Sequence, residues 1–238
     1  MVSNTKKVGI IGAMDIEVKL LKTSLTNAQE TILGGLSFVE GNLDGIPVVI
    51  VQSGIGKVNA ALCAQRLILQ FEVTHVINTG IAGAAAHGLT VLDFVVSTDA
   101  LYHDMDVTGF GYKKTQIPQM KCSDFPADAQ MIRAAKEAFS TIKNAEGHKI
   151  IEGRVASGDQ FISDKTVKAR IIEDCAPACV EMEGAAIAHA CYLNNIPFVV
   201  IRCMSDMADD GGESTYSFND ETAANLSAAV VRKMIALF

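Results

Sequence analysis

Four carboxylates stand where they could share one chemical task. Glu17 lies one turn into a predicted helix, Glu181 and Glu183 open another helix, and Asp206 follows an apolar run that reads as a strand. A carboxyl group at the end of a buried strand is partly desolvated, which raises its pKa toward that of a general acid. Breaking a glycosidic bond needs such an acid and a carboxylate that activates water. A third carboxylate could hold sugar hydroxyls, and no metal or cofactor is required. Acids in a first helical turn also suit the helix dipole, so a structural role for Glu181 and Glu183 stays open.

Two small-residue segments could bring backbone amides close to a ligand. In Ser53–Asn59, asparagine stands where a dinucleotide fingerprint has its third glycine, and the P-loop serine or threonine is also missing. The segment is therefore either a tight strand-to-helix turn or a ligand contact. Thr79–Gly83 is predicted to be a second turn, at a strand end. Neither it nor Gly12–Glu17 contains arginine, which disfavours phosphate as a co-substrate.

The elements that would position these residues alternate between strands and helices, a pattern typical of an α/β fold with a mixed central sheet flanked by helices. Strands are predicted at Lys7–Ile11, Leu36–Leu43, Ile46–Gln52, His75–Thr79, Asp93–Ser97, Lys149–Ala156 and Phe198–Cys203. Helices are predicted at Asp15–Leu25, Lys57–Leu69, Ala127–Ser140, Asp164–Glu173, Met182–Asn194 and Asn219–Leu237. Tyr102–Pro126 and Met207–Phe218 are expected to be irregular lids or binding loops. The carboxyl ends of the strands should gather the functional residues.

Composition narrows the classes of protein. The chain has 238 residues, 49% of them hydrophobic, and a net charge of −7. We expect one domain over residues 1–238. The negative charge disfavours nucleic acid as a partner, and no segment is predicted to span or bind a membrane. Six scattered cysteines without a C-x-x-C pair suit buried thiols in a cytoplasmic protein.

Several segments, in their order along the chain, resemble one family. They are Ile10–Glu17, Ser53–Lys57, Asn78–Gly80, Tyr102–Thr108, Ser157–Asp159, Val180–Glu183 and Ser205–Asp206. On these the chain is similar to the 5′-methylthioadenosine/S-adenosylhomocysteine nucleosidases of the nucleoside phosphorylase-like superfamily. The resemblance implies a three-layer α/β/α fold and a homodimer. It also implies hydrolysis of methylthioadenosine and S-adenosylhomocysteine to adenine, in methionine salvage, with 5′-deoxyadenosine as a further candidate substrate and no cofactor.

The resemblance also implies roles for individual residues. Glu17 matches the base that activates water, and Asp206 matches the acid that protonates adenine N7. Glu183 matches the acid that binds the ribose hydroxyls, with Met182 packed on the sugar, and Ser205 and Arg202 match neighbours that support the acid. The remaining positions that match substrate-binding residues are Phe161 and Ile162 at the base, Met14 and Phe218 at the 5′-substituent, and Ile55 and Glu181. Val107, Phe110 and Pro118 match a loop with which a partner subunit completes the pocket.

The sequence departs from the family at three places. Ile81 stands where serine is common, and Ala84 replaces a frequent glycine. The segment Asp210–Thr215 differs from the family in the length or sequence of a loop near the expected site. Three other functions are compatible with the same acids or fold. They are a purine nucleoside phosphorylase, an aminodeoxyfutalosine nucleosidase and a nucleoside-binding protein without catalysis.

Overall fold

The computed structural model describes residues 6–209 and 212–238, with side chains from residue 219 onward in the second range. Its strands are β1 (Val8–Gly12), β2 (Thr26–Leu33), β3 (Leu36–Leu43), β4 (Ile46–Gln52), β5 (His75–Ala84), β6 (Phe94–Tyr102), β7 (Asp124–Pro126), β8 (Ile150–Ser157), β9 (Cys179–Glu181) and β10 (Phe198–Asp206). Its α-helices are α1 (Asp15–Thr23), α2 (Lys57–Gln70), α3 (Ala129–Phe139), α4 (Lys165–Cys175), α5 (Gly184–Asn194) and α6 (Gly212–Met234).

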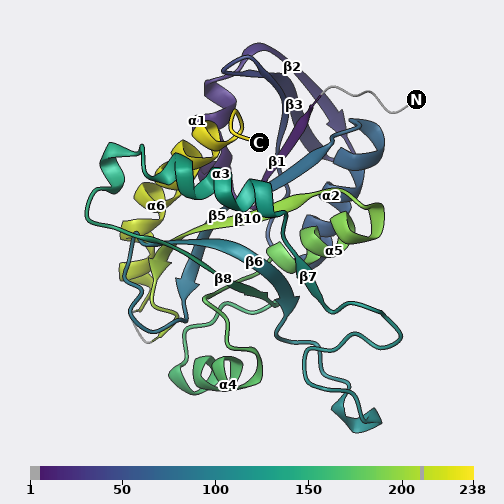
Figure 1. Ribbon diagram of the computed structural model, residues 1–238, viewed down its shortest axis with the longest axis vertical. Helices are drawn as coiled ribbons and strands as arrows, with labels where there is room; N and C mark the ends of the chain where they lie inside the picture. Colours follow the sequence, from purple (N-terminus) through teal and green to yellow (C-terminus); the bar gives the residue numbers. More distant parts are fainter. Residues whose placement is uncertain (1–5, 210–211) are drawn as a thin grey trace.

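All of these strands belong to one mixed sheet (Figure 1). Its order is β10-β6-β8-β9-β5-β1-β4-β3-β2, and β7 pairs with β6. A further parallel pairing joins β10 to β5, so β10, β6, β8, β9 and β5 form a closed ring from which β1, β4, β3 and β2 extend. Such closure removes exposed strand edges on that side of the sheet.

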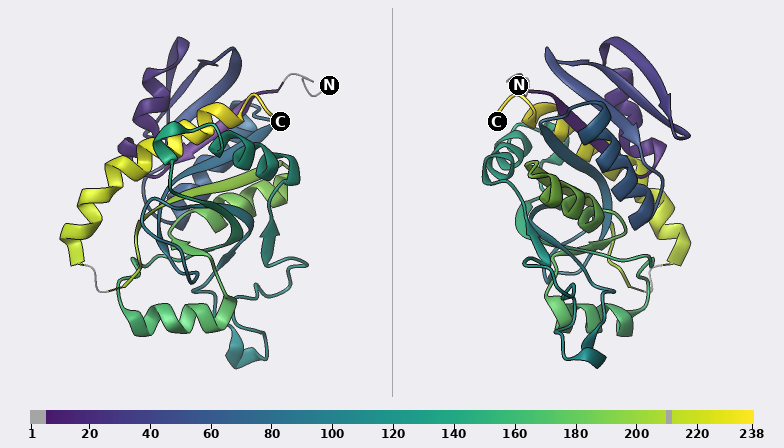
Figure 2. Two further views of the ribbon diagram at one scale, coloured as in Figure 1. Left: turned by 60° about the vertical axis from the view of Figure 1, so that its left-hand side comes forward. Right: turned by 90° about the vertical axis from the view of Figure 1, so that its right-hand side faces the viewer.

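Helices cover both faces of the sheet (Figures 1 and 2). On one face α2 and α5 pack against residues such as Ile11, and on the other α1, α3 and α6 pack against residues such as Ile10. This alternation follows from the two-residue period of a strand, and the central parallel strands are apolar on both faces because both faces are buried. The predicted three-layer α/β/α class is confirmed. Helix α4 packs separately, on a small cluster that includes Ile162 and Ala208.

Several local predictions were wrong. Thr79–Gly83 is not a turn but part of β5, because β5 pairs with β10 as far as Gly83 and this pairing keeps the chain extended. Strands β2, β7 and β9 were not predicted: β2 is polar and exposed, and the other two have three residues each. Helix α6 begins at Gly212, inside the stretch expected to be irregular.

The segment between β6 and β7 projects from the body of the molecule and carries only a short 3-10 helix, Thr108–Phe110 (Figure 1). This agrees with the expectation of an irregular loop. Over the part of the chain that the structure describes, no helix has the length and apolar character needed to cross a membrane.

Candidate active site

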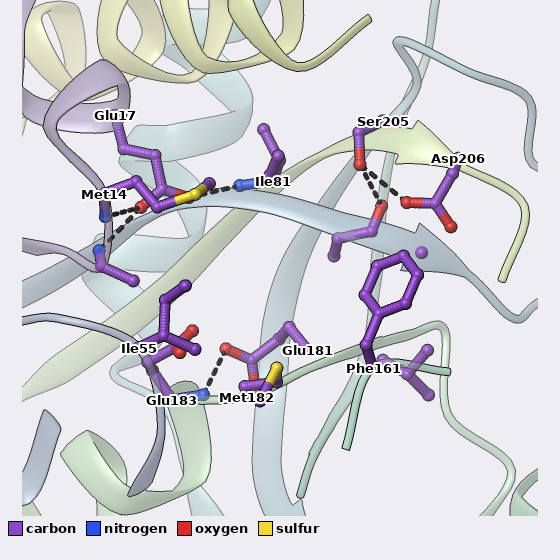
Figure 3. A pocket seen from close by; sticks show the side chains of 14 residues that line it. Met14, Glu17, Ile55, Ile81, Phe161, Glu181, Met182, Glu183, Ser205 and Asp206 are labelled. Atoms are coloured by element: carbon purple, nitrogen blue, oxygen red, sulfur yellow. Dashed lines mark hydrogen bonds between the residues drawn. The ribbon is translucent and has the colours of Figure 1, made fainter. Parts of the chain in front are cut away.

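A cavity lies where residues from several strand ends meet (Figure 3). It is lined by Ala13, Met14, Glu17, Ile55, Ile81, Ala82, Gly83, Phe161, Val180, Glu181, Met182, Glu183, Ser205 and Asp206. These residues follow or end β1, β4, β5, β8, β9 and β10. The location agrees with the rule that open α/β sheets place their sites at the carboxyl ends of strands.

Glu17 sits in a cradle of backbone amides at the start of α1. Its Oε2 accepts hydrogen bonds from the amides of Ala13 (2.7 Å) and Met14 (2.9 Å), and Oε1 accepts one from Ile81 (3.1 Å). The side chain is buried, and this burial raises the pKa of Glu17, while Arg202 and the amides act in the opposite direction. All three hydrogen-bonding neighbours are groups that can only donate, so the cradle fits the ionised form of the carboxylate.

Glycine at position 80 makes that cradle possible. A Cβ atom there would lie 2.3 Å from Glu17 Oε1 and 2.6 Å from an Arg202 guanidinium nitrogen. Such distances are shorter than any van der Waals contact, so only glycine lets strand β5 pass this close to both side chains.

Behind the cavity, Arg202 is buried and binds two neighbours. One guanidinium nitrogen donates to Asn78 Oδ1 (2.6 Å) and forms an ion pair with Glu181. Glu181 also accepts from the Ser157 hydroxyl and from the amides of Glu183 (3.0 Å) and Gly184 (2.8 Å). Both oxygens of Glu181 therefore have protein partners, and the residue fixes the start of α5.

The support expected from Arg202 for Asp206 is not what the structure shows. In β10, Arg202 pairs with Gly80 and Asp206 with Gly83. Four residues of strand span roughly 13 Å, and within the described residues no hydrogen bond or ion pair joins the two side chains. The Arg202 guanidinium instead offsets the charge of Glu181, and its Nη2 lies 3.9 Å from Glu183 Oε2.

Glu183 lies beside this buried ion pair. Its Oε1 accepts a hydrogen bond from the Gly56 amide (2.8 Å). Burial, followed by the negative charge of Glu181, raises the pKa of Glu183 to about 7, against the opposing effects of Arg202 and the Gly56 amide. The carboxylate lines the cavity, where it could bind hydroxyl groups.

Asp206 ends strand β10 and is half-buried. Its Oδ2 accepts from the Ser205 hydroxyl (2.8 Å), and its Oδ1 accepts from the Ala208 amide (2.7 Å). A hydroxyl can donate or accept, so Ser205 can also accept a hydrogen bond from a protonated Asp206. The carboxyl group is thus supported in both protonation states, as a general acid requires. In Figure 3 Glu17 and Asp206 lie on opposite sides of the cavity.

Apolar side chains complete the cavity. Met14, Ile55, Met182 and Phe161 all line it. Phe161 lines the cavity and is 59% exposed. Ile162 lies in a smaller adjoining hollow that shares Phe161 and Asp206 with the main cavity.

Other predicted residues lie elsewhere. None of Val107, Phe110 and Pro118 lines the cavity of its own chain, and Phe110 is 85% exposed. The side chain of Phe218 and the segment Asp210–Thr215 lie outside the described residues, apart from the backbone of α6 from Gly212 onward.

Some residues that form the site lie in segments that the sequence analysis selected, although no individual role was predicted for them. Ala82, Gly83 and Val180 line the cavity, and Asn78 and Ser157 hold the side chains behind it. The small residues of Thr79–Gly83 were expected to approach a ligand from a turn, whereas they line the cavity from strand β5. Among the residues that the structure describes, no group of histidine, cysteine, aspartate and glutamate has the arrangement of a metal site.

Comparison with known proteins gives a consistent result. A family model described as the phosphorylase superfamily matches residues 7–236. A 5′-methylthioadenosine/S-adenosylhomocysteine nucleosidase of Colwellia psychrerythraea is 46% identical over 235 residues, covering 96% of this chain and 95% of that protein.

Solved structures of proteins with the same name have the same fold as this chain. A nucleosidase of the same name from Colwellia psychrerythraea, in complex with adenine, superimposes with a TM-score of 0.94 at 42% identity, covering 100% of this chain and 97% of that one. One from Neisseria meningitidis, in complex with methylthio-immucillin-A, gives 0.91 at 40% identity, covering 97% and 98%.

Proposed function

Because this chain belongs to the phosphorylase superfamily and, within it, to the 5′-methylthioadenosine/S-adenosylhomocysteine nucleosidases, we propose that it hydrolyses the N-glycosidic bond of methylthioadenosine and S-adenosylhomocysteine. The products are adenine and the 5-thio-substituted ribose. The observation that carries the proposal is the convergence of Glu17, Glu183 and Asp206, from three separate elements, on one cavity.

In the proposed reaction, Asp206 donates its proton to adenine N7 as the bond between the base and C1′ breaks. The bonding electrons leave with the base, which departs as neutral adenine, and the ribosyl group develops oxocarbenium character. Water then bonds to C1′ while Glu17 takes its proton. This division between acid and base follows inverting glycosidases.

The surroundings of each carboxyl group support its proposed role. The donor-only cradle favours ionised Glu17, and burial raises its pKa, so the ionised group is a stronger proton acceptor than an exposed glutamate. The Ser205 hydroxyl adapts to either state of Asp206. Glu183 would bind the ribose hydroxyls, with Met182 against the sugar.

The remaining contacts fit an adenine nucleoside. Phe161 and Ile162 would hold the base, and Met14 and Phe218 the 5′-substituent, with Ile55 beside the sugar. The polar Glu181 would act through its bonds to the start of α5.

Water is favoured over phosphate as the attacking group. Among the described residues that line the cavity, none is lysine or arginine, and Arg202 is committed to Glu181 and Asn78 behind it. A bound phosphate dianion would therefore meet carboxylates without a compensating cation, which is unfavourable in a partly desolvated site.

We further propose that residues 1–238 form a single catalytic domain of a cytoplasmic homodimer that serves methionine salvage. In that dimer Val107, Phe110 and Pro118 would close the 5′ end of the partner's pocket. The exposure of Phe110 on a projecting loop supports this assignment.

The test is adenine release from methylthioadenosine by purified protein, first in phosphate-free buffer and then with phosphate added. Adenine release without phosphate is expected. Release that depends on phosphate would make the protein a phosphorylase, and no release from either thio-nucleoside would contradict the proposal. The same assay ranks S-adenosylhomocysteine and 5′-deoxyadenosine.

A further inference from the structure

We propose that Lys57 is a positioning residue, which fixes the Gly56 amide against Glu183 and thereby orients the carboxylate at the ribose end of the cavity. The inference rests on the proposed function, which assigns Glu183 to the ribose hydroxyls. Lys57 itself does not line the cavity, so its effect passes through the neighbouring turn.

Lys57 joins three segments of the chain. It is the first residue of α2, and its amide donates to Asp159 Oδ1 (2.9 Å). Its Nζ donates to Asp104 Oδ2 (2.6 Å) and lies 3.5 Å from Asp159 Oδ2. Asp104 Oδ2 also accepts from the Asp159 amide (3.1 Å). The turn before α2, the loop after β6 and the segment leading to Phe161 therefore meet at one ammonium group.

The turn that Lys57 anchors contains two glycines in an unusual backbone conformation. Gly54 and Gly56 both have positive φ, at 82° and 97°, and glycine adopts many other backbone conformations at low cost. The Ser53 and Asn59 side chains hold the turn from within, through hydrogen bonds to the carbonyls of Gly54 (2.8 Å) and Ile55 (2.7 Å). Lys57 adds contacts to neighbouring segments on the side of Gly56. Gly56, directly before Lys57, supplies the amide that binds Glu183 Oε1, and Ile55 of the same turn lines the cavity.

The charges at this junction are suited to a fixed arrangement. Burial opposes the charge of Asp104, yet the hydrogen bonds from Lys57 and the Asp159 amide hold the pKa of Asp104 below its usual value. Asp159 also lies at the N-terminus of α2, where a negative charge is favourable. The Lys57 and Asp104 side chains are 25% and 23% exposed, against 47% and 44% for the surface pair Lys136–Glu152. The more shielded pair should be the stronger one.

The test compares Lys57→Met with Lys57→Arg, and uses Lys136→Met as the matched control on the surface. For Lys57→Met we expect KM for methylthioadenosine to rise about tenfold with kcat little changed, because ribose binding contributes to the ground and transition states alike. Lys57→Arg should restore most of the loss, and Lys136→Met should behave as wild type.

Two further measurements separate positioning from a general loss of structure. Without the Gly56 hydrogen bond the pKa of Glu183 should rise further, so the corresponding midpoint in the pH profile of kcat/KM should move to higher pH in Lys57→Met only. The Gly56 amide should also exchange its hydrogen faster in this variant, while amides in the sheet keep their wild-type rates.

Unchanged KM, pH profile and Gly56 exchange in Lys57→Met would overturn the proposal. Faster exchange throughout the molecule would also overturn it, since Lys57 would then stabilise the fold in general. If wild-type protein releases no adenine, the proposed function fails, and the catalytic part of this inference fails with it. Adenine release by wild type with an unaltered variant contradicts the inference alone.

Discussion

The surroundings of Glu17 and Asp206 differ in what their hydrogen-bonding groups can do. Glu17 is buried among three backbone amides, which only donate. Asp206 is half-buried between one amide and the Ser205 hydroxyl, which can reverse its role. The first arrangement favours a single protonation state and the second accommodates two. A base and an acid can thus be distinguished by their neighbours, although both are carboxylates at the same edge of one sheet.

The largest effect is expected from Glu17→Gln. Glutamine has one acceptor oxygen, so its NH₂ group must face at least one of the three amides in the cradle. We expect turnover to fall by about 10²–10⁴-fold through loss of the base, and the free energy of unfolding to fall by about 1–3 kcal/mol through an unsatisfied buried donor. Adenine release and urea unfolding measure the two effects. Unchanged stability would mean that the cradle is not selective for a carboxylate.

Asp206→Asn should show the activity loss without the loss of stability. In this variant the asparagine side-chain oxygen can accept a hydrogen bond from the Ala208 amide, and the NH₂ group can donate one to the Ser205 hydroxyl. The hydroxyl then rotates so that its oxygen accepts. We expect turnover to fall by about 10²–10⁴-fold, because an amide cannot protonate the base, with the free energy of unfolding within about 0.5 kcal/mol of wild type. Near-normal turnover would remove Asp206 from the role of acid.

The smallest effect concerns Glu183, which extends the comparison to a third carboxylate. Its pKa is raised from 4.5 to about 7, so between these values the folded state binds more protons than the unfolded state, and stability should fall as pH rises. The contribution is at most roughly 3 kcal/mol. Glu183→Gln removes this titration, so wild type should lose stability relative to the variant between pH 5 and pH 7.5. Urea unfolding measures this difference. If the free energies of unfolding of wild type and Glu183→Gln change in parallel across that pH range, the raised pKa of Glu183 is contradicted.

Sequence reasoning was most successful where local pattern and burial agree. Strands β3 and β4 were predicted with their observed bounds. The tight-turn pair Asp44 and Gly45 separates them in the sequence and leaves few alternatives. The cavity-lining positions Met14, Phe161 and Met182 came from the family resemblance, and periodicity alone would not have identified them.

Other features depend on residues far apart in the sequence. Strand β5 continues past Thr79 because β10 pairs beside it, and β10 follows more than a hundred residues later. The same pairing sets Arg202 beside Gly80, where the guanidinium meets Glu181 and lies away from Asp206. No local signal encodes either outcome.

The sequence by itself determined the alternation of strands and helices, the acids at their ends and the glycines that permit close approach. Only the tertiary structure decided which acid received donor-only neighbours and which received a hydroxyl. The physical reason is that the pKa and hydrogen bonding of a carboxyl group depend on the groups within a few ångströms. Around Glu17 these come from the turn between β1 and α1, from β5 and from β10 together.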